Sequence, residues 1–167
     1  MNTITEIEPI TFLECTSDER KEFCFALRHA IYCELMSFEE ENDEKMERDE
    51  FDDHARHFII QIDNVDVGCF RVVQDGTAHI QPFITADCFF EISRFIIEPE
   101  HRNPALLSHV VKELTVMIQS AGLMPTCMIM EKKLARFISL HGVKMKRSSP
   151  FFKLNGLRAA YFFSEDM

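Results

Sequence analysis

Three short clusters of charged residues have side chains that can bind ions or move protons. The first is acidic: Glu47, Asp49 and Asp52 can bind an ammonium group or hold a neighbouring arginine. The second is Arg71, which follows Gly68 in an otherwise apolar run. Because an arginine inside such a run is uncommon, we expect it to contact a carboxylate or an anionic ligand.

The third cluster lies in a long apolar run and has the sequence Glu91-Ile92-Ser93-Arg94-Phe95. Side chains alternate along a strand, so Glu91, Ser93 and Phe95 are expected to point to one side of it. The same rule sends Ile92 and Arg94 to the other side. Burying a glutamate and an arginine in an apolar strand costs free energy unless the two charges are paired or serve a function.

Glu91 therefore has two interpretations. It can form a structural ion pair, for instance with Arg71, which would satisfy both charges. It can also act as a general base, because burial raises the pKa of a carboxyl group toward the range that suits proton transfer. The two roles are compatible, since a structural partner also tunes a base.

Possible metal ligands occur only in weak patterns. His54 and His57 are three residues apart and follow Asp53, but acidic runs are usually solvated, so we expect no metal there. The cysteines form no CxxC pair, and most lie in apolar runs. We therefore expect reduced, buried thiols and neither zinc ligands nor disulfides. The six cysteines are Cys15, Cys24, Cys33, Cys69, Cys88 and Cys127.

The elements that position these clusters follow from hydrophobic spacing and turn residues. We expect helices over residues 17–35, 104–120 and 131–141. We expect strands over residues 10–13, 57–62, 67–73, 89–97, 126–130, 143–145, 151–154 and 158–163. The acidic segment after the first helix is expected to be a loop or a short exposed helix. Since a helix separates two strands, part of the sheet should be parallel, which predicts one α+β domain over residues 1–167 with a mixed central sheet flanked by helices.

The overall charge excludes some classes of function. The chain has 28 acidic and 18 basic residues and a net charge of −10, which argues against a general nucleic-acid-coating role. No run approaches the roughly 20 apolar residues of a membrane span. The first residues are neither basic nor followed by an apolar segment, so we expect no signal peptide and a cytoplasmic location. The aromatic residues comprise 16 Phe, 2 Tyr and no Trp.

The charge is unevenly distributed along the chain. Residues 39–53 contain ten acidic and two basic residues, a net of −8, whereas residues 131–158 contain eight basic and one acidic, a net of +7. One interpretation is two solvated faces of opposite sign. The other is that the basic segment docks an acidic partner.

Taken together, the spacing of these residues resembles a known enzyme branch. The N-terminal motif positions are Arg28, Tyr32, Phe38, Glu47-x-Asp49-x-x-Asp52, Gly68-x-x-Arg71 and Glu91-x-Ser93-Arg94-Phe95. The C-terminal positions are Leu134-x-x-Phe137, His141-Gly142, Phe151 and Asn155-Gly156-x-Arg158. Over about residues 28–163 the chain resembles the autoinducer-synthase branch of the GNAT acyltransferase superfamily. That branch includes the acyl-homoserine-lactone synthases and the long-chain N-acyl amino acid synthases, and its fold has the order of elements expected above.

Two departures from the family pattern bear on the substrates. The homoserine-lactone synthases carry a Trp shortly after the first Arg, whereas here Phe38 lies near that place, which favours the amino acid synthases. Ordinary GNAT enzymes hold the pyrophosphate of coenzyme A on a glycine-containing loop, but residues 102–107 contain no glycine. Such a loop brings fewer backbone N–H groups to a phosphate. We therefore expect an acyl carrier protein, which is acidic and suits the basic 131–158 segment, in preference to coenzyme A.

The resemblance implies transfer of a fatty acyl group from a thioester to an amine. It implies that Glu91 is the base and that Ser93 either bonds to the acceptor or only ends the strand. A backbone N–H in the segment 95–97 would stabilise the oxyanion. The thioester is a co-substrate, with no cofactor bound permanently, and the Phe and Met residues are candidate linings of an apolar acyl tunnel.

The remaining implied site residues belong to the acceptor or to the donor. Arg71 and Arg94 hold the acceptor carboxylate or lock the acidic loop, and the acidic residues bind the acceptor ammonium or brace Arg28 and Arg71. The implied acceptor-binding residues are Arg28, Glu47, Asp49, Asp52, Arg71, Arg94 and Phe95. The implied donor-binding residues are Ile96, Ile97 and Arg102.

Three other functions compete with this hypothesis. The first is a homoserine-lactone synthase that uses S-adenosylmethionine as acceptor. The second is a GNAT-fold protein that has lost catalysis and binds an acyl carrier or another acidic partner, which the glycine-free loop favours and Glu91 opposes. The third is a small metal-binding module at His54 and His57.

Overall fold

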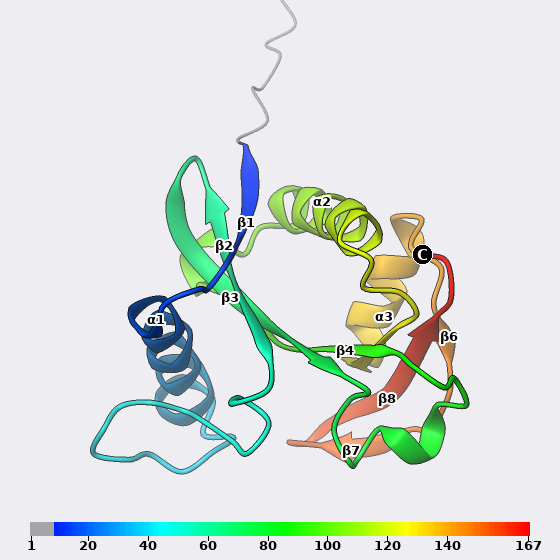
Figure 1. Ribbon diagram of the computed structural model, residues 1–167, viewed down its shortest axis with the longest axis horizontal. Coiled ribbons are helices and arrows are strands. Elements are labelled where there is room, and N and C mark those ends of the chain that lie inside the picture. Colours follow the sequence, from blue (N-terminus) through cyan, green and yellow to red (C-terminus); the bar gives the residue numbers. More distant parts are fainter. Residues whose placement is uncertain (1–8) are drawn as a thin grey trace, which may run out of the picture.

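The computed structural model describes residues 9–167 and shows a twisted sheet with helices on both faces (Figure 1). The strands are β1 Ile10–Glu14, β2 Arg56–Ile62, β3 Val65–Gln74, β4 Phe90–Ile97, β5 Thr126–Glu131, β6 Lys146–Arg147, β7 Phe152–Leu154 and β8 Leu157–Ser164. The helices are α1 Asp18–Arg28, α2 Pro104–Ser120 and α3 Lys132–Leu140. Three short helical segments are the π-helical η1 His29–Leu35, which continues α1, and the 3-10 turns η2 Gln81–Phe83 and η3 Pro99–His101.

The sheet has the order β1-β2-β3-β4-β5-β8-β6, and β7 pairs with β8. Every pairing is antiparallel except that of β4 with β5, which α2 connects. A right-handed crossover through a helix is the usual way to place two strands in parallel. The expected α+β fold with a partly parallel sheet is therefore confirmed.

The two faces of the sheet carry separate cores because neighbouring residues of a strand point in opposite directions. On β3, Cys69 packs with Leu27 and Ile31 of the α1–η1 helix. The next residue, Phe70, packs with Val110 and other residues of α2. The α1 side of the sheet thus lies opposite the side covered by α2 and α3.

Most boundaries agree with the sequence, and the exceptions have local causes. The strand expected over residues 143–145 is wrong, because Val143 and Met145 pack under α3 and the strand forms at residues 146–147. β3 begins two residues earlier than expected because Asp63 and Asn64, both with positive φ, form a tight hairpin turn. The helix expected over residues 17–35 is present, but its last seven residues, His29–Leu35, are π-helical.

Candidate active site

β4 and β5 pair over a short distance and then diverge. Phe90, Glu91 and Ile92 pair with Thr126, Cys127 and Met128, whereas the rest of β4 pairs with β3 only. The backbone of residues 93–97 is consequently free of a strand partner on the β5 side. A ligand with a carbonyl group can approach this part of β4 from that side, so the end of the pairing is the natural place to look for a reactive site.

A β-bulge at this point changes which side chains share a face. Arg71 is opposite Ser93 and Cys69 is opposite Ile96, so Phe70 alone faces two residues of β4. The expected alternation is therefore wrong after Ser93. Phe95 does not point with Glu91 and Ser93; its ring lies 6.4 Å from that of Phe70 in the core on the α2 side.

The same bulge places Arg94 beside the acidic loop. Arg94 has a φ of 55°, a left-handed backbone conformation that is unusual for a residue with a side chain. Its Nη2 atom lies 3.0 Å from Glu47 Oε1 and 3.2 Å from Asp49 Oδ2. Strain of this kind is typical of residues that a functional site holds in place.

Three arginines and three carboxylates from distant parts of the chain form one network. Arg28 donates to Glu47 through Nε and to Asp52 through Nη1 and Nη2, at 2.8 and 3.0 Å. Arg71 donates to Asp49 at 2.6 Å and to Asp52 at 2.9 Å. Its Nε also donates to Ser93 Oγ at 3.2 Å. The structure thus brings together all the acceptor-site residues expected from the sequence except Phe95.

The electrostatics of this network are those of a balanced, buried cluster. Burial alone would raise the pKa of Asp52, but the bonds and charges of Arg28 and Arg71 outweigh it and lower the pKa to about 2. Burial would lower the pKa of Arg28, but its bonds to Asp52 and Glu47 raise it. The pKa of His57, whose Nε2 lies 3.1 Å from the Asp52 carbonyl oxygen, is lowered by burial and by the nearby arginines.

Glu91 stands apart from the network. The ion pair with Arg71 considered from the sequence is not formed, because Arg71 is occupied by Asp49, Asp52 and Ser93. Glu91 is only 4 % exposed, and its Oε2 accepts a hydrogen bond from the backbone N–H of Thr77 at 2.6 Å. Residues 9–167 contain three buried carboxylates, Glu47, Asp52 and Glu91. Of these, only Glu91 has no cationic partner within ion-pair distance. A buried acid without a cation is a common property of catalytic acids and bases.

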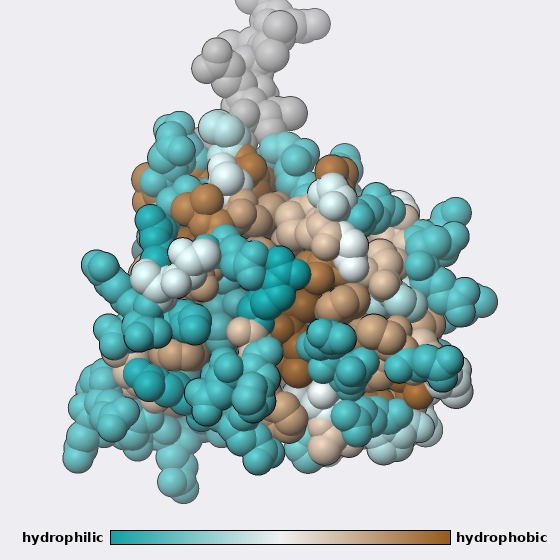
Figure 2. Space-filling view, in the orientation of Figure 1, coloured by the Kyte–Doolittle hydropathy of each residue, from teal (hydrophilic) through white to brown (hydrophobic). Residues whose placement is uncertain are grey.

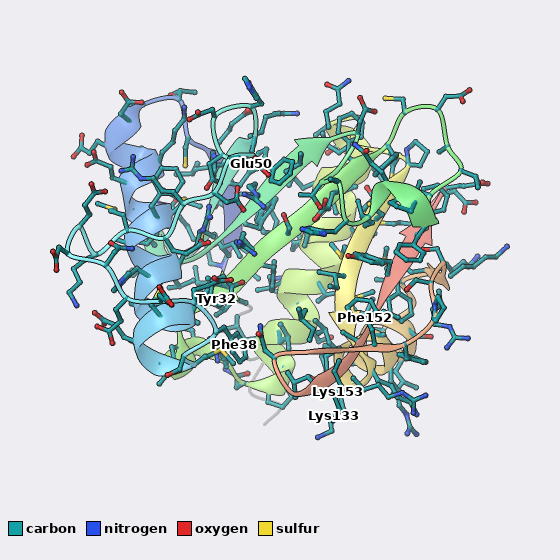
Figure 3. All side chains as sticks on the ribbon, turned by 90° about the horizontal axis from the view of Figure 1, so that it is seen from below. Tyr32, Phe38, Glu50, Lys133, Phe152 and Lys153 are labelled. Atoms are coloured by element: carbon teal, nitrogen blue, oxygen red, sulfur yellow. The ribbon has the colours of Figure 1, made fainter. Side chains whose placement is uncertain are left out.

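Aromatic residues border the network. The rings of Tyr32 and Phe38 stack at 6.4 Å, and the Arg94 guanidinium carbon lies 5.6 Å from the Tyr32 ring centre. Burial raises the pKa of Tyr32 to about 12. Figure 3 shows Tyr32 and Phe38 at the end of the first helix, with Phe152 and Lys153 across the central strands from them.

The loop before α2 offers few free donors to a phosphate. Asn103 is the N-cap of α2, and its Oδ1 accepts the N–H of Leu106 at 2.8 Å. Pro104, at the first position, has no N–H. Arg102 is also engaged, since its Nε donates to the Ile97 carbonyl at 2.6 Å. Ile97 packs in the core on the α2 side and Ile96 in the core on the α1 side, so both side chains are buried.

A small cavity of about 250 Å³ lies between α3, β5 and β8. Its wall is mostly apolar, and Lys132 and Arg136 also line it. The apolar lining residues are Met130, Ala135, Ile138, Val143, Met145, Phe151 and Phe162. Figure 2 shows hydrophobic residues gathered in the middle of one face of the molecule, between hydrophilic margins.

The basic residues of segment 131–158 are all exposed, and none of them forms an ion pair with a carboxylate of residues 9–167. They are Lys132, Lys133, Arg136, Lys144, Lys146, Arg147, Lys153 and Arg158. By contrast, the arginines of the network neutralise three carboxylates of the acidic loop, Glu47, Asp49 and Asp52. The basic surface is thus left uncompensated, as a surface for an anionic partner would be.

The structure does not assemble a metal site from His54 and His57. His54 is exposed, whereas His57 is buried and bonded to the backbone of Asp52. The part of the chain that the structure describes has one group of three close ligand atoms, Glu98, Glu100 and His101, which the sequence patterns missed. All six thiols are free, and five of them are buried, which was expected of cysteines in apolar runs, while Cys88 is exposed. No described helix is long and apolar enough to cross a membrane.

Comparison with known proteins gives a family and a set of structural neighbours. Residues 27–112, about half of the chain, match the family described as acetyltransferase (GNAT) domain. MesI, a CoA-dependent acyl-homoserine lactone synthase, superposes with a TM-score of 0.77 at 19 % identity, over 95 % of this chain and 89 % of its own. BjaI, a CoA-dependent acyl-homoserine lactone synthase solved with SAM and isopentyl-CoA, gives 0.74 at 15 % identity, over 96 % and 84 %.

A third neighbour is FeeM, an N-acyl amino acid synthase from uncultured soil microbes. It superposes with a TM-score of 0.65 at 11 % identity, over 93 % of this chain and 90 % of its own. A comparison with curated protein sequences gave no significant match. The structural neighbours confirm the fold expected from the sequence motifs.

Proposed function

Because the chain belongs to the acetyltransferase (GNAT) domain family, we propose that it transfers a fatty acyl group from a thioester to the amine of an amino acid or amino-acid-derived acceptor. The main support for this proposal is the burial and position of Glu91. It is a buried carboxylate with no cation at ion-pair distance within residues 9–167, at the point where β4 leaves β5 and two residues before Ser93, whose hydroxyl accepts a hydrogen bond from Arg71. A base in that position can accept a proton from an amine that approaches the free side of β4.

The reaction needs one base and one oxyanion donor. The amine nitrogen attacks the thioester carbonyl carbon, and Glu91 accepts its proton directly or through one water molecule. A backbone N–H in the segment 95–97, on the part of β4 without a β5 partner, stabilises the resulting oxyanion. The C–N bond is then complete, the C–S bond breaks, and the thiolate leaves and takes up a proton.

The network divides into bracing residues and residues that can reach the acceptor. Arg28 and Asp52 are almost fully buried, and Asp52 satisfies the donors of both Arg28 and Arg71, which is a bracing role. Arg94 and Asp49 are about one-quarter exposed, at 27 % and 26 % of their side chains. We assign the acceptor carboxylate to Arg94, whose buried Nε has no hydrogen-bond partner within residues 9–167, and the acceptor ammonium to Asp49.

For the donor, we propose an acyl carrier protein in preference to coenzyme A. The loop before α2 has no glycine, and Asn103, Pro104 and Arg102 leave it few free donors for a pyrophosphate. The exposed basic residues of segment 131–158 suit the acidic surface of a carrier. The CoA-dependent neighbours MesI and BjaI make coenzyme A the competing donor.

The cavity between α3, β5 and β8 is the proposed place for the acyl tail. Its lining of Met, Phe and aliphatic residues matches an alkyl chain, and its volume of about 250 Å³ limits the length of chain that fits.

A homoserine-lactone synthase remains the second candidate, because MesI and BjaI have that activity and share the fold. The two candidates differ in product. Mass spectrometry of lipid extracts from cells that express the wild type, Glu91→Gln or Glu22→Gln distinguishes them. Glu22 is an exposed glutamate on α1 and serves as the matched control.

The proposal predicts an N-acyl amino acid in the wild type and in Glu22→Gln, and much less of it in Glu91→Gln. An N-acyl homoserine lactone would favour the second candidate. The absence of any new acylated product would refute both, and unchanged product in Glu91→Gln would remove Glu91 as base.

A further inference from the structure

The loop between β3 and β4, residues 75–89, lies beside the N-terminal end of β4 (Figure 1). It is closed at its base by a hydrogen bond from the Asp75 N–H to the Phe89 carbonyl at 2.7 Å. Ile80 of this loop is fully buried and packs with Phe89, Cys127 and Tyr161. The loop is therefore fixed to the sheet at a defined place.

This loop supplies the one hydrogen bond that the structure gives to the Glu91 carboxylate. The backbone N–H of Thr77 donates to Oε2 at 2.6 Å. Within residues 9–167, Oε1 has no hydrogen-bond partner. One oxygen is thus held by the loop while the other is left for a proton from the substrate.

Gly76 allows the loop to reach Glu91. Its φ is +67°, a conformation that other residues adopt only with strain. A Cβ at this position would lie 2.6 Å from Ile80 Cγ2 and 2.7 Å from Phe89 Cε2. Since both contacts are with buried side chains, any larger residue would displace the turn that carries the Thr77 amide.

A second contact secures the middle of the loop, away from its base. The ring of Phe83, in η2, stacks on Tyr161 of β8 with ring centres 5.2 Å apart. Tyr161 in turn lies 5.4 Å from Phe152 of β7. The loop is therefore held at two places: at its base by the backbone hydrogen bond, and in its middle by the aromatic side chains of β7 and β8.

We propose that Gly76 and Thr77 are positioning residues, which hold the Glu91 carboxylate through the Thr77 amide so that Oε1 faces the acceptor amine. This inference rests on the proposed function of Glu91. The loop fixes the orientation of the base. Neither Gly76 nor Thr77 contacts the substrate.

The buried titratable groups that face Glu91 do not interfere with a test by pH. Cys127 on β5 and Tyr161 on β8 are the groups that face it, and burial raises the pKa of both. They stay neutral at acidic pH. The titratable side chains of the loop itself, Asp75, His79, Asp87 and Cys88, are exposed.

The direct test is the amide resonance of Thr77 in the ¹⁵N-labelled wild type, followed over the acidic pH range. We expect its proton shift to titrate with the same midpoint as the acid limb of kcat/KM, and we expect this titration to vanish in Glu91→Gln. A Thr77 amide that does not titrate, or that titrates unchanged in Glu91→Gln, overturns the inference.

The functional test compares two glycines with the same backbone conformation. Gly76→Ala is expected to lower kcat by about a hundredfold, because a misplaced catalytic group costs about that much, and to move the acid limb of kcat/KM to higher pH. Gly122→Ala is the control, since Gly122 has a φ of +70° and no atom within 4 Å of its added Cβ.

The outcomes separate the two proposals. A folded Gly76→Ala enzyme with the wild-type acid limb overturns the positioning role, and if this variant does not fold, the Thr77 resonance of the wild type decides. If the wild type forms no amide product, the proposed function alone is overturned. The Thr77 titration and its loss in Glu91→Gln then still test whether the Thr77 amide holds the Glu91 carboxylate.

Discussion

Replacing Asp52 by asparagine tests whether the buried network is held together by charge. Asparagine keeps the shape of the side chain but leaves Arg28 and Arg71 without the anion that both contact, at 2.8 and 2.9 Å. The pKa of Asp52 is lowered from 3.8 to about 2. A shift of that size is worth about 2 kcal/mol in favour of the charged form, and breaking a buried pair costs about 3–5 kcal/mol in other proteins.

We therefore expect Asp52→Asn to lower the free energy of unfolding by about 2–4 kcal/mol at neutral pH, as measured by urea denaturation and circular dichroism. The folded-state pKa of Asp52 lies below the unfolded value. The contribution of the charged Asp52 side chain to the free energy of unfolding is thus fully present above about pH 4 and is lost as the pH falls toward 2. The difference between wild type and variant must shrink over that interval.

Asp53→Asn provides the control, because Asp53 is the neighbouring residue and is exposed. It is expected to change the stability by less than about 1 kcal/mol, as is usual for exposed charges. Equal effects of the two substitutions, or a difference between wild type and Asp52→Asn that stays constant down to pH 2, would show that charge does not hold the network together.

Three further predictions follow from the cavity, the basic surface and the buried histidine. Ala135→Phe fills the proposed acyl cavity and should lower activity with a dodecanoyl donor more than with a butyryl donor; an unchanged ratio contradicts the assignment. Lys133→Glu combined with Arg136→Glu should raise KM for a carrier-protein donor by about tenfold or more and leave KM for a coenzyme A donor unchanged, and equal effects on both donors would argue against carrier docking. The pKa of His57 is lowered below 6.5, so its contribution to stability is present above that pH and lost below it. Urea midpoints measured from pH 8 to 5 should fall less in His57→Gln than in wild type, whereas His54→Gln should follow the wild type.

The order of elements was predictable because helix caps and turns are local signals. Pro104 after Asn103 predicted the start of α2, and the structure places the helix at Pro104–Ser120, as expected. The parallel pairing of β4 and β5 followed from the helix between them. The prediction of a strand over residues 143–145 was wrong because its apolar residues line the cavity under α3. No local sequence pattern reveals this packing.

The site was predictable as a set of residues but not as a geometry. The sequence placed Arg28, the acidic loop and Arg71 in one group, and the structure joins them by hydrogen bonds. The bulge at Arg94 could not be foreseen, because alternation along a strand is the default and the bulge depends on pairing with β3. For the same reason the side assigned to Phe95 was wrong.

The contact between Thr77 and Glu91 was also missed. It is made by a backbone N–H, and the identity of Thr77 carries no information about it. Asp75-Gly76 was the available signal, since this pair marks a turn immediately after a strand. The signal indicates where the chain turns but not what the exposed amide will meet.

The central claim is that Glu91 serves an amine-acylating site. Its most direct test is the mass of the product that the purified protein forms from a decanoyl carrier-protein thioester and a mixture of the common amino acids. We expect an N-decanoyl amino acid from the wild type, with the rate lowered by at least about a hundredfold in Glu91→Gln, as for other general bases. An equal rate in both proteins, or no amide from the wild type with either a carrier-protein or a coenzyme A donor, would contradict it.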